Sequence, residues 1–101
     1  MPAYVLVDIE VTDPVQYEAY KKLAADTVVA FGGRYVVRGG KVETLEGEWP
    51  THRLVILEFP TAARAREWWD SPAYRPARRM RQASARTNML LVEGFPLDCG
   101  R

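Results

Sequence analysis

Arg81 occupies a position at which the sequence pattern predicts a buried side chain. It lies in the segment 73–86, and a helical wheel with about 100° per residue puts it on the same face as Tyr74 and Ala77. A guanidinium on an apolar helix face needs a partner, because an unpaired buried charge is very costly. We therefore predict that Arg81 binds a small anionic ligand. The alternative is a buried structural bond to a carboxylate or to helix-end carbonyls.

Arg38 closes a short predicted strand, residues 34–38, just before two glycines. Alternation along that strand directs its side chain to the sheet face that the helices leave uncovered. Asp8, Glu58 and Glu93 are expected on the same face. Arg38 and Glu58 are therefore candidate ligand-binding residues, and the arginine would bind an anion or a carboxylate. The alternative is a structural ion pair among these groups.

His52 is the only histidine in the chain, so imidazole acid–base chemistry would fall on it. We include it among the candidate ligand-binding residues, and a hydrogen-bonded or solvated structural histidine is the alternative. The sequence does not identify catalytic residues. No set of cysteine, histidine and carboxylate residues has the spacing of a metal site. The chain also lacks a phosphate-binding loop, a nucleophile elbow and a dinucleotide fingerprint, so no cofactor is expected.

The aromatic residues Trp68, Trp69 and Tyr74 surround a Ser71-Pro72 break between two helical segments. Adjacent indoles are about 100° apart on a helix, so only one of them can face the sheet, and the sequence does not say which. An aromatic side chain with a polar tip beside such a break can line a pocket. Trp68 and Tyr74 are therefore candidate ligand-binding residues, with ordinary core packing as the alternative.

The hydrophobic pattern predicts the elements that would position these residues. Strands are predicted at 3–11, 34–38, 52–59 and 88–93, and helices at 14–31, 62–70 and 73–86. Residues 41–51 are polar and form a hairpin-like excursion between two strands. The order β-α-β-β-α-β, with the second helix in two pieces, is that of the ferredoxin-like α+β fold. This fold has a four-stranded antiparallel sheet with its helices on one face.

The sheet face without helices is predicted to be too apolar to face water. We expect the helices to cover the purely apolar rows, namely Val5, Val7, Ile9, Val11, Tyr35, Val37, Val55, Leu57, Phe59, Leu90 and Val92. The open face would still carry Leu6, Val36, Leu54, Ile56, Met89 and Leu91. Because large apolar patches mark interfaces, we predict a homodimer through this open face. A helix or loop of the same chain that covers the face is the alternative, but no spare element remains to provide it.

Length and composition indicate one small globular domain. The chain has 101 residues, of which 48% are hydrophobic, and we place the domain at 1–96 and a tail at 97–101. Cys99 lies in that tail and is expected to be an incidental thiol. The formal net charge of +1 argues against binding to nucleic acid or to an anionic membrane. No apolar run approaches the ~20 residues of a membrane helix, and no signal peptide is evident, so we expect a cytoplasmic protein.

Several segments together resemble a known family. They are GGRYVVRGG (32–40), the loop around Gly47, LEFPTAARAREWWDSPAYRPARRMR (57–81) and LVEG (91–94). Over almost the whole chain they are similar to the uncharacterised domain-of-unknown-function family 1330 (DUF1330). The resemblance implies a dimeric α+β barrel, in a superfamily that also holds cofactor-independent monooxygenases, lactone isomerases and haem-handling proteins. It implies no particular reaction.

Three functions remain open from the sequence. The first is a homodimer that binds a small organic ligand, such as a carboxylate, between the sheet and the second helix. The second is a cofactor-independent enzyme, isomerase-like or monooxygenase-like, that uses His52 or Glu58 as a base on a small organic acid. The third is a structural or interaction module without catalysis. Nucleic-acid binding through the basic segment 75–86 is not expected, because no aromatic residue interleaves its arginines.

Overall fold

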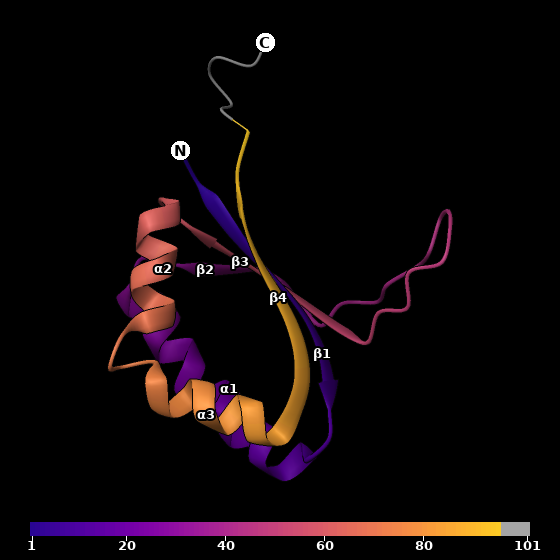
Figure 1. Ribbon diagram of the computed structural model, residues 1–101, viewed down its shortest axis with the longest axis horizontal. Coiled ribbons are helices and arrows are strands. Elements are labelled where there is room, and N and C mark those ends of the chain that lie inside the picture. Colours follow the sequence, from indigo (N-terminus) through magenta and orange to yellow (C-terminus); the bar gives the residue numbers. More distant parts are fainter. Residues whose placement is uncertain (96–101) are drawn as a thin grey trace.

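The computed structural model describes residues 1–95, and its elements follow the predicted order. They are β1 (Ala3–Val11), α1 (Pro14–Ala30), β2 (Arg34–Arg38), β3 (Arg53–Phe59), α2 (Ala62–Asp70), α3 (Arg75–Ser84) and β4 (Ala85–Glu93). All strand pairs are antiparallel, and the sheet order is β2-β3-β1-β4. Figure 1 shows the three helices on one side of the sheet, which confirms the ferredoxin-like α+β fold. The predicted tail at 97–101, with Cys99, lies outside the described residues.

The ends of α1 follow from the residues around it. Asp13 accepts a hydrogen bond from the backbone N–H of Gln16 at 3.2 Å, and Pro14 occupies the first turn. After Phe31, Gly32 has a φ of 79°, a left-handed conformation that glycine adopts without steric penalty. With 17 residues α1 is the longest of the three helices, and no helix within residues 1–95 is long and apolar enough to cross a membrane.

The core lies between the sheet and the helices. The buried residues of β1 alternate along the strand and are at most 4% exposed. Trp68 of α2 is 1% exposed, and its ring centroid is 5.3 Å from that of Phe59. Its indole N–H donates to the Thr27 hydroxyl at 3.1 Å. Trp68 therefore faces the sheet, whereas Trp69 is 39% exposed at the edge of the helix layer.

The side chains of β4 point in the opposite direction to the predicted one. β4 pairs with β1 so that Met89 lies opposite the core residue Val7. Residues that are directly opposite in a ladder share a face, so Met89 and Leu91 point toward the helices, and Leu90 and Val92 point to the open face. The prediction is wrong because both rows of this strand are apolar, and alternation alone does not choose between them.

A bulge in β2 changes the direction of Arg38. Tyr35 lies opposite Leu57, whereas Arg38 lies opposite Val55, so one extra residue stands on β2 between these pairs. Because Val55 faces the core, Arg38 points toward the helices and not to the open face. The predicted direction of Arg38 is wrong, and so is that of Val37, which shares the open face.

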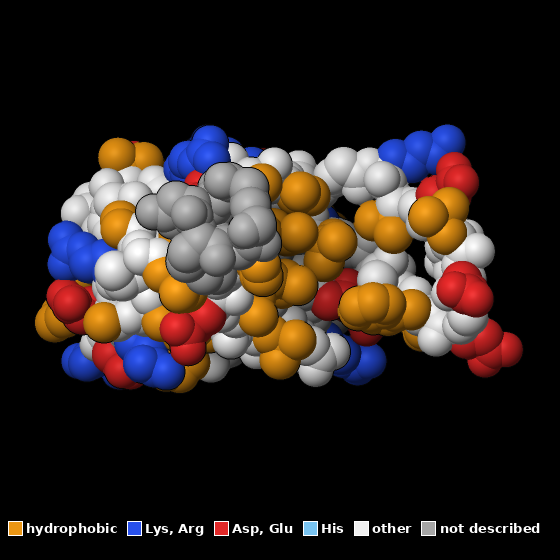
Figure 2. All heavy atoms as spheres, turned by 90° about the horizontal axis from the view of Figure 1, so that it is seen from above, with side chains coloured by type: hydrophobic (Ala, Val, Ile, Leu, Met, Phe, Trp, Pro, Cys, Tyr) orange, Lys and Arg blue, Asp and Glu red, His pale blue; other side chains and the backbone are white. Residues whose placement is uncertain are grey.

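The open face of the sheet, on the side away from the helices, carries apolar side chains. Leu6, Leu54 and Ile56 are half-buried there, and Leu90 and Val92 are 65% and 47% exposed. In Figure 2 hydrophobic side chains gather beside the gap between the body of the protein and its projecting segment. The predicted apolar open face is therefore present, although β4 contributes Leu90 and Val92 to it instead of Met89 and Leu91.

Candidate functional site

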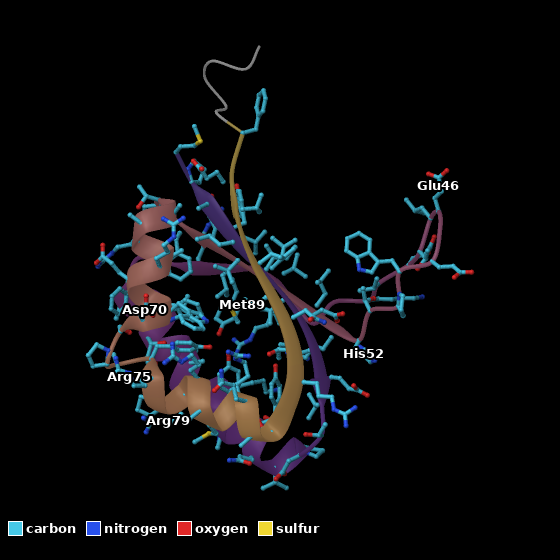
Figure 3. All side chains as sticks on the ribbon, in the orientation of Figure 1. Glu46, His52, Asp70, Arg75, Arg79 and Met89 are labelled. Atoms are coloured by element: carbon cyan, nitrogen blue, oxygen red, sulfur yellow. The ribbon has the colours of Figure 1, made fainter. Side chains whose placement is uncertain are left out.

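The candidate site lies in the interior between the sheet and the helices. A cavity of about 20 Å³ lies there, which is room for about one water molecule. Its polar wall consists of side chains from α1, β2 and β3, namely Tyr17, Tyr20, Lys21, Tyr35, Arg38 and Arg53. Its apolar wall includes Val7, Val55, Trp68 and Met89. Figure 3 shows side chains from the sheet and from the helices that meet in this space.

Arg81 of α3 is buried, as the helical wheel predicts, with 3% of its surface exposed. Its Nε donates to the Tyr74 hydroxyl at 3.4 Å, and its Nη1 donates to the Thr87 hydroxyl. Both partners are neutral. Among residues 1–95 no carboxylate lies within 4.0 Å of the Arg81 guanidinium. The carboxylate form of the structural alternative, a buried ion pair, is therefore not present in this part of the chain.

Two phenols extend the contacts of Arg81 toward α1. The hydroxyls of Tyr74 and Tyr20 are 3.2 Å apart, and the Trp68 ring stacks on that of Tyr74 with the centroids 4.1 Å apart. Burial raises the pKa of Tyr20 far above its ordinary value, and Tyr74 adds to the rise while the Arg81 charge opposes it. Tyr20 therefore stays protonated at neutral pH, and it can donate a hydrogen bond but cannot act as a base.

Two further arginines lie on the helix side of the sheet: Arg53 is half-buried, and Arg38, at the end of the edge strand β2, is exposed. The Arg38 guanidinium lies 4.2 Å from the centre of the Tyr35 ring, in a cation–π contact. Burial raises the pKa of Tyr35, and the charge of Arg38 opposes that rise. The Arg53 Nε is buried without a hydrogen-bond partner, and its guanidinium rests against Gly39, where a side chain would collide with it. Neither arginine has a carboxylate partner in the described part of the chain.

These side chains form one group, which we call the arginine–tyrosine cluster: Arg38, Arg53, Arg81, Tyr20, Tyr35 and Tyr74. It combines three guanidinium groups with neutral phenols. Within residues 1–95 no carboxylate lies within 4.0 Å of its guanidinium groups. Arg81 and the Arg53 Nε are buried, and because buried charges in proteins are normally paired, the cluster is chemically suited to hold an anion.

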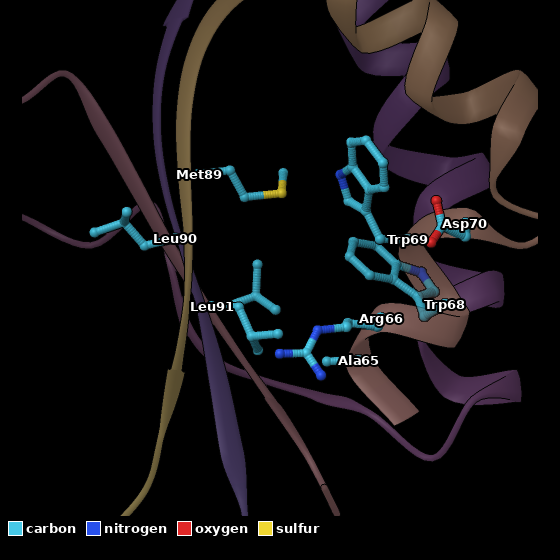
Figure 4. A pocket seen from close by; sticks show the side chains of 9 residues that line it. Ala65, Arg66, Trp68, Trp69, Asp70, Met89, Leu90 and Leu91 are labelled. Atoms are coloured by element: carbon cyan, nitrogen blue, oxygen red, sulfur yellow. The ribbon is translucent and has the colours of Figure 1, made fainter. Parts of the chain in front are cut away.

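A larger pocket, which we call the apolar pocket, adjoins the cluster between α2 and β4; most of its lining is apolar, and Arg66 and Asp70 are its charged lining residues. It has a volume of about 270 Å³, and Figure 4 shows Trp69 facing Met89 and Leu91 across it. Trp68 and Met89 line both this pocket and the interior cavity, so these two side chains separate the spaces. Methionine is flexible and adapts easily to a neighbour. Movement of Met89 would join the apolar pocket to the cationic interior.

The structure does not bring His52 to the arginine–tyrosine cluster. Figure 3 shows His52 on the other side of the sheet from the helical residues Asp70 and Arg79. Its backbone N–H donates to the Asp8 carboxylate at 2.9 Å, and its ring nitrogens lie 3.9 Å and 4.0 Å from Asp8 and Glu10. Within residues 1–95 no three histidine, cysteine or carboxylate side chains come together as metal ligands would.

Glu58 also lies apart from the cluster. It stands on the open face, where Arg34 donates to its carboxylate at 2.6 Å and the Tyr4 hydroxyl donates at 3.3 Å. Arg38 points to the opposite face because of the bulge in β2. The predicted grouping of Arg38 with Glu58 is therefore wrong, whereas Trp68, Tyr74 and Arg81 do lie together.

Sequence reasoning missed three members of the cluster as site residues: Arg53, Tyr20 and Tyr35, the last of which was predicted only as part of the apolar row under the helices. Arg53 begins β3 in the same row as Val55 and Leu57, and a charged residue in an apolar row is a signal of the kind that identified Arg81. Tyr20 lies on the buried side of α1, but its contact with Tyr74 joins positions 54 residues apart. No sequence pattern within one helix or strand could have predicted that contact.

Solved structures of low sequence identity share this fold. A protein of unknown function from Rhodopseudomonas palustris, RPA0582, is 22% identical with a TM-score of 0.76, over 94% of this chain and 83% of that chain. A dimeric ferredoxin-like protein of unknown function from Jannaschia sp. CCS1 is 17% identical with a TM-score of 0.64, over 93% and 100% of the two chains. SnoaB, a cofactor-independent oxygenase from Streptomyces nogalater, is 14% identical with a TM-score of 0.64, over 94% of each chain. At these identities the likeness shows the fold alone.

The sequence itself points to a family and not to an individual characterised protein. No curated protein matches it significantly. The family described as "Domain of unknown function (DUF1330)" matches residues 2–95. This range includes the glycine-flanked strand, both tryptophans of α2 and the whole arginine–tyrosine cluster, and the chain belongs to the DUF1330 family.

Proposed function

We propose that this protein is a homodimer that binds a small organic acid between its sheet and helices α2 and α3. The observation that carries the proposal is the burial of Arg81 without a carboxylate partner among residues 1–95. Arg38 and Arg53 line the adjoining cavity together with Tyr20, whose hydroxyl meets that of Tyr74. A ligand carboxylate would supply the negative charge that this part of the chain lacks.

A carboxylate suits the arginine–tyrosine cluster chemically. A guanidinium presents paired N–H donors that match two carboxylate oxygens, and such charge-assisted hydrogen bonds are about twice as strong as neutral ones. The Tyr74 hydroxyl lies beside Arg81 and the Tyr20 hydroxyl lies beside that of Tyr74, and both can serve as neutral donors. We propose Arg81 as the principal contact, with Tyr74 and Tyr20 as the groups that orient the bound carboxylate.

The apolar pocket constrains the remainder of the ligand. Its volume of about 270 Å³ and its walls of Trp69, Met89 and Leu91 suit one aromatic ring or a short branched chain. The interior cavity of about 20 Å³ is too small for a carboxylate, so we propose that Met89 turns aside when the ligand binds. Trp68 would then contact the ligand between its acidic and apolar parts.

The open face supports the dimer. Leu6, Leu54 and Ile56 lie there beside the exposed Leu90 and Val92, and stacking against a second sheet would remove these side chains from water. The structurally similar protein from Jannaschia sp. CCS1 is described as dimeric, which supports the same assembly. We propose a two-fold arrangement in which the two open faces pack on each other.

We propose binding, without acid–base catalysis, at the arginine–tyrosine cluster. Its side chains are arginines and phenols, and Tyr20 stays protonated at neutral pH. The two side chains that the sequence offered as bases, His52 and Glu58, lie elsewhere. The oxygenase activity of SnoaB belongs to a protein that shares the fold at 14% identity, and we do not extend it to this chain.

Isothermal titration calorimetry with phenylacetate tests the proposal. We expect one phenylacetate per subunit for the wild-type protein and no measurable binding for Arg81→Met, because the methionine cannot pair with a carboxylate. Arg79→Met is the matched control, since Arg79 is an exposed arginine on the same helix, and it should bind like the wild type. Phenylacetamide keeps the ring and lacks the charge, so it should bind at least about tenfold more weakly.

Two results would count against the proposal. Equal binding of phenylacetate by the wild type and by Arg81→Met would place the ligand outside the cluster. Failure of the folded wild-type protein to bind any member of a series of aromatic and branched monocarboxylates would remove the proposed function altogether. Thermal unfolding is an independent readout, because a ligand at about 100 times its dissociation constant adds about 2.7 kcal/mol of stability.

A further inference from the structure

The segment 40–51, which we call the arm, projects from the body of the protein. It connects β2 to β3, and Figure 1 shows it extending away from the sheet on the side opposite the helices. All residues from 40 to 50 are exposed, and Leu45 and Trp49 are 89% and 73% exposed. Figure 3 shows Glu46 at the outer tip. Large apolar side chains held this far from their own core mark a contact surface.

We propose that the arm is a clamp that closes on a second copy of this chain. A groove of about 620 Å³ separates the arm from its own open sheet face. Its apolar lining comes from both sides, namely Val42, Leu45 and Trp49 of the arm and Leu6, Leu54 and Leu90 of the sheet. The clamp rests on the dimer proposed above, because the groove continues the surface on which the second sheet would pack.

The arm is long enough to reach past the sheet of a second copy. Twelve residues that run out and back reach at most about 20 Å, at about 3.3–3.6 Å per residue. A sheet packed on the open face would lie about 10 Å away, and helices about 10–12 Å in diameter would lie behind it. The arm therefore passes the edge of the partner sheet and reaches the layer that contains the partner helices.

The charges of the arm and of the helix layer are complementary. The arm carries three glutamates, Glu43, Glu46 and Glu48, against a single lysine. In the helix layer α3 contains four arginines and no acidic residue. Arg66 and Arg79 are exposed there and have no carboxylate within 4.0 Å among residues 1–95. In the clamp, the acidic tip of each arm lies near these arginines of the second copy.

Sedimentation equilibrium of the full chain over a range of concentrations tests the clamp. The double variant Leu45→Ser/Trp49→Ser should raise the dimer dissociation constant at least about tenfold, because the arm loses its apolar contacts. Val15→Ser is the matched control: Val15 is 84% exposed on α1, and its substitution should leave the constant unchanged. The triple variant Glu43→Gln/Glu46→Gln/Glu48→Gln should weaken the dimer at low salt and match the wild type at about 1 M salt.

The variant Leu54→Glu separates this inference from the dimer itself. Suppose that Leu54→Glu is monomeric and that both arm variants dimerise with the wild-type dissociation constant. This result would overturn the clamp and leave the sheet-face dimer intact. A wild-type protein that stays monomeric at every concentration would overturn both. If the serine variant weakens the dimer and the glutamine variant does not, the apolar contacts of the clamp are supported and the proposed charge pairing is overturned.

Discussion

At the scale of single residues, Arg81 shows the sharpest conflict between burial and charge. It is 3% exposed, and its described hydrogen-bond partners are two hydroxyl groups. A structural arginine at such a depth normally faces a carboxylate, because the cost of desolvation otherwise remains. An arginine that serves a ligand carries this cost until the ligand arrives. Replacement of the arginine by an uncharged residue should therefore lower the stability in the first role and raise it in the second.

Arg81→Met is expected to raise the free energy of unfolding by about 1–3 kcal/mol when no anion is present. The methionine occupies a similar volume and carries no charge that must leave water. Urea denaturation in a buffer free of carboxylate and phosphate measures the change, with Arg75→Met as a control close to zero, since Arg75 is an exposed arginine of α3 outside the proposed clamp contacts. A loss of more than about 1 kcal/mol in Arg81→Met would instead indicate that Arg81 is structural.

Tyr20 makes stability sensitive to alkaline pH. Its pKa in the folded protein lies above the value of about 10 in an unfolded chain, so the folded state holds the proton more tightly. The stabilisation is complete below about pH 10 and is lost as the pH rises further. Tyr20→Phe removes the titrating group, so its free energy of unfolding should fall less between about pH 9 and 11 than that of the wild type. Equal losses in urea denaturation would show that Tyr20 titrates normally in the folded protein.

Arg81 and Tyr74 of the site could be predicted from the sequence, and the direction of the strand residue Arg38 could not. Arg81 and Tyr74 follow from periodicity within one helix, which is a local property. The direction of Arg38 depends on how β2 pairs with β3, where an extra residue enters the ladder. The pattern of alternation in 34–38 contains no sign of that bulge, so the predicted face was wrong.

At the scale of elements, the turn from α1 into β2 depends on close packing at Gly33. A Cβ atom at this position would lie 2.7 Å from the Phe59 ring and 2.9 Å from Cγ1 of Val28. Both neighbours are core residues with 0% exposure, so neither has free space into which it can move. Gly33 is therefore required by a contact between elements.

Gly33→Ala should lower the free energy of unfolding by about 1–3 kcal/mol, the usual cost of forcing extra volume into a packed core. Gly40→Ala is the matched control, because no atom outside its chain neighbours lies within 4 Å of an added Cβ there. Thermal or urea unfolding of the two variants makes the comparison. Equal stability would contradict the packing described for the turn.

The order of the elements could be predicted because each has its own period and end signals. The register of β4 could not, since its two rows are both apolar: Met89 and Leu91 form one, and Leu90 and Val92 form the other. Only the pairing with β1 selects the row that meets the helices. Sheet register is a property of two strands, and a single strand with two apolar faces does not determine it.

At the scale of the whole molecule, the open face predicts assembly. Leu54 lies half-buried on that face in β3. Leu54→Glu should convert a dimer into a monomer, because the new carboxylate would lose water at the interface without a partner. Light scattering gives the mass, and Val15→Glu on the exposed side of α1 is the control. A dimeric mass for Leu54→Glu would contradict packing through this face.

The arm illustrates what the sequence of one chain leaves undetermined. Its polar composition predicted an excursion between two strands, and residues 41–51 do form one. The reason for Leu45 and Trp49 at its exposed positions is not local. In the proposed dimer these side chains meet a second copy, so their environment depends on assembly and not on the fold of one subunit.

The crystal structure of the protein with 4-bromobenzoate, recorded at the bromine absorption edge, measures the ligand position directly. We predict an anomalous bromine peak in the apolar pocket between Trp69 and Leu91, with the carboxylate within hydrogen-bond distance of Arg81 and Met89 turned aside. Bromine found only outside this pocket, or a bound carboxylate without contact to Arg81, would contradict the proposed site.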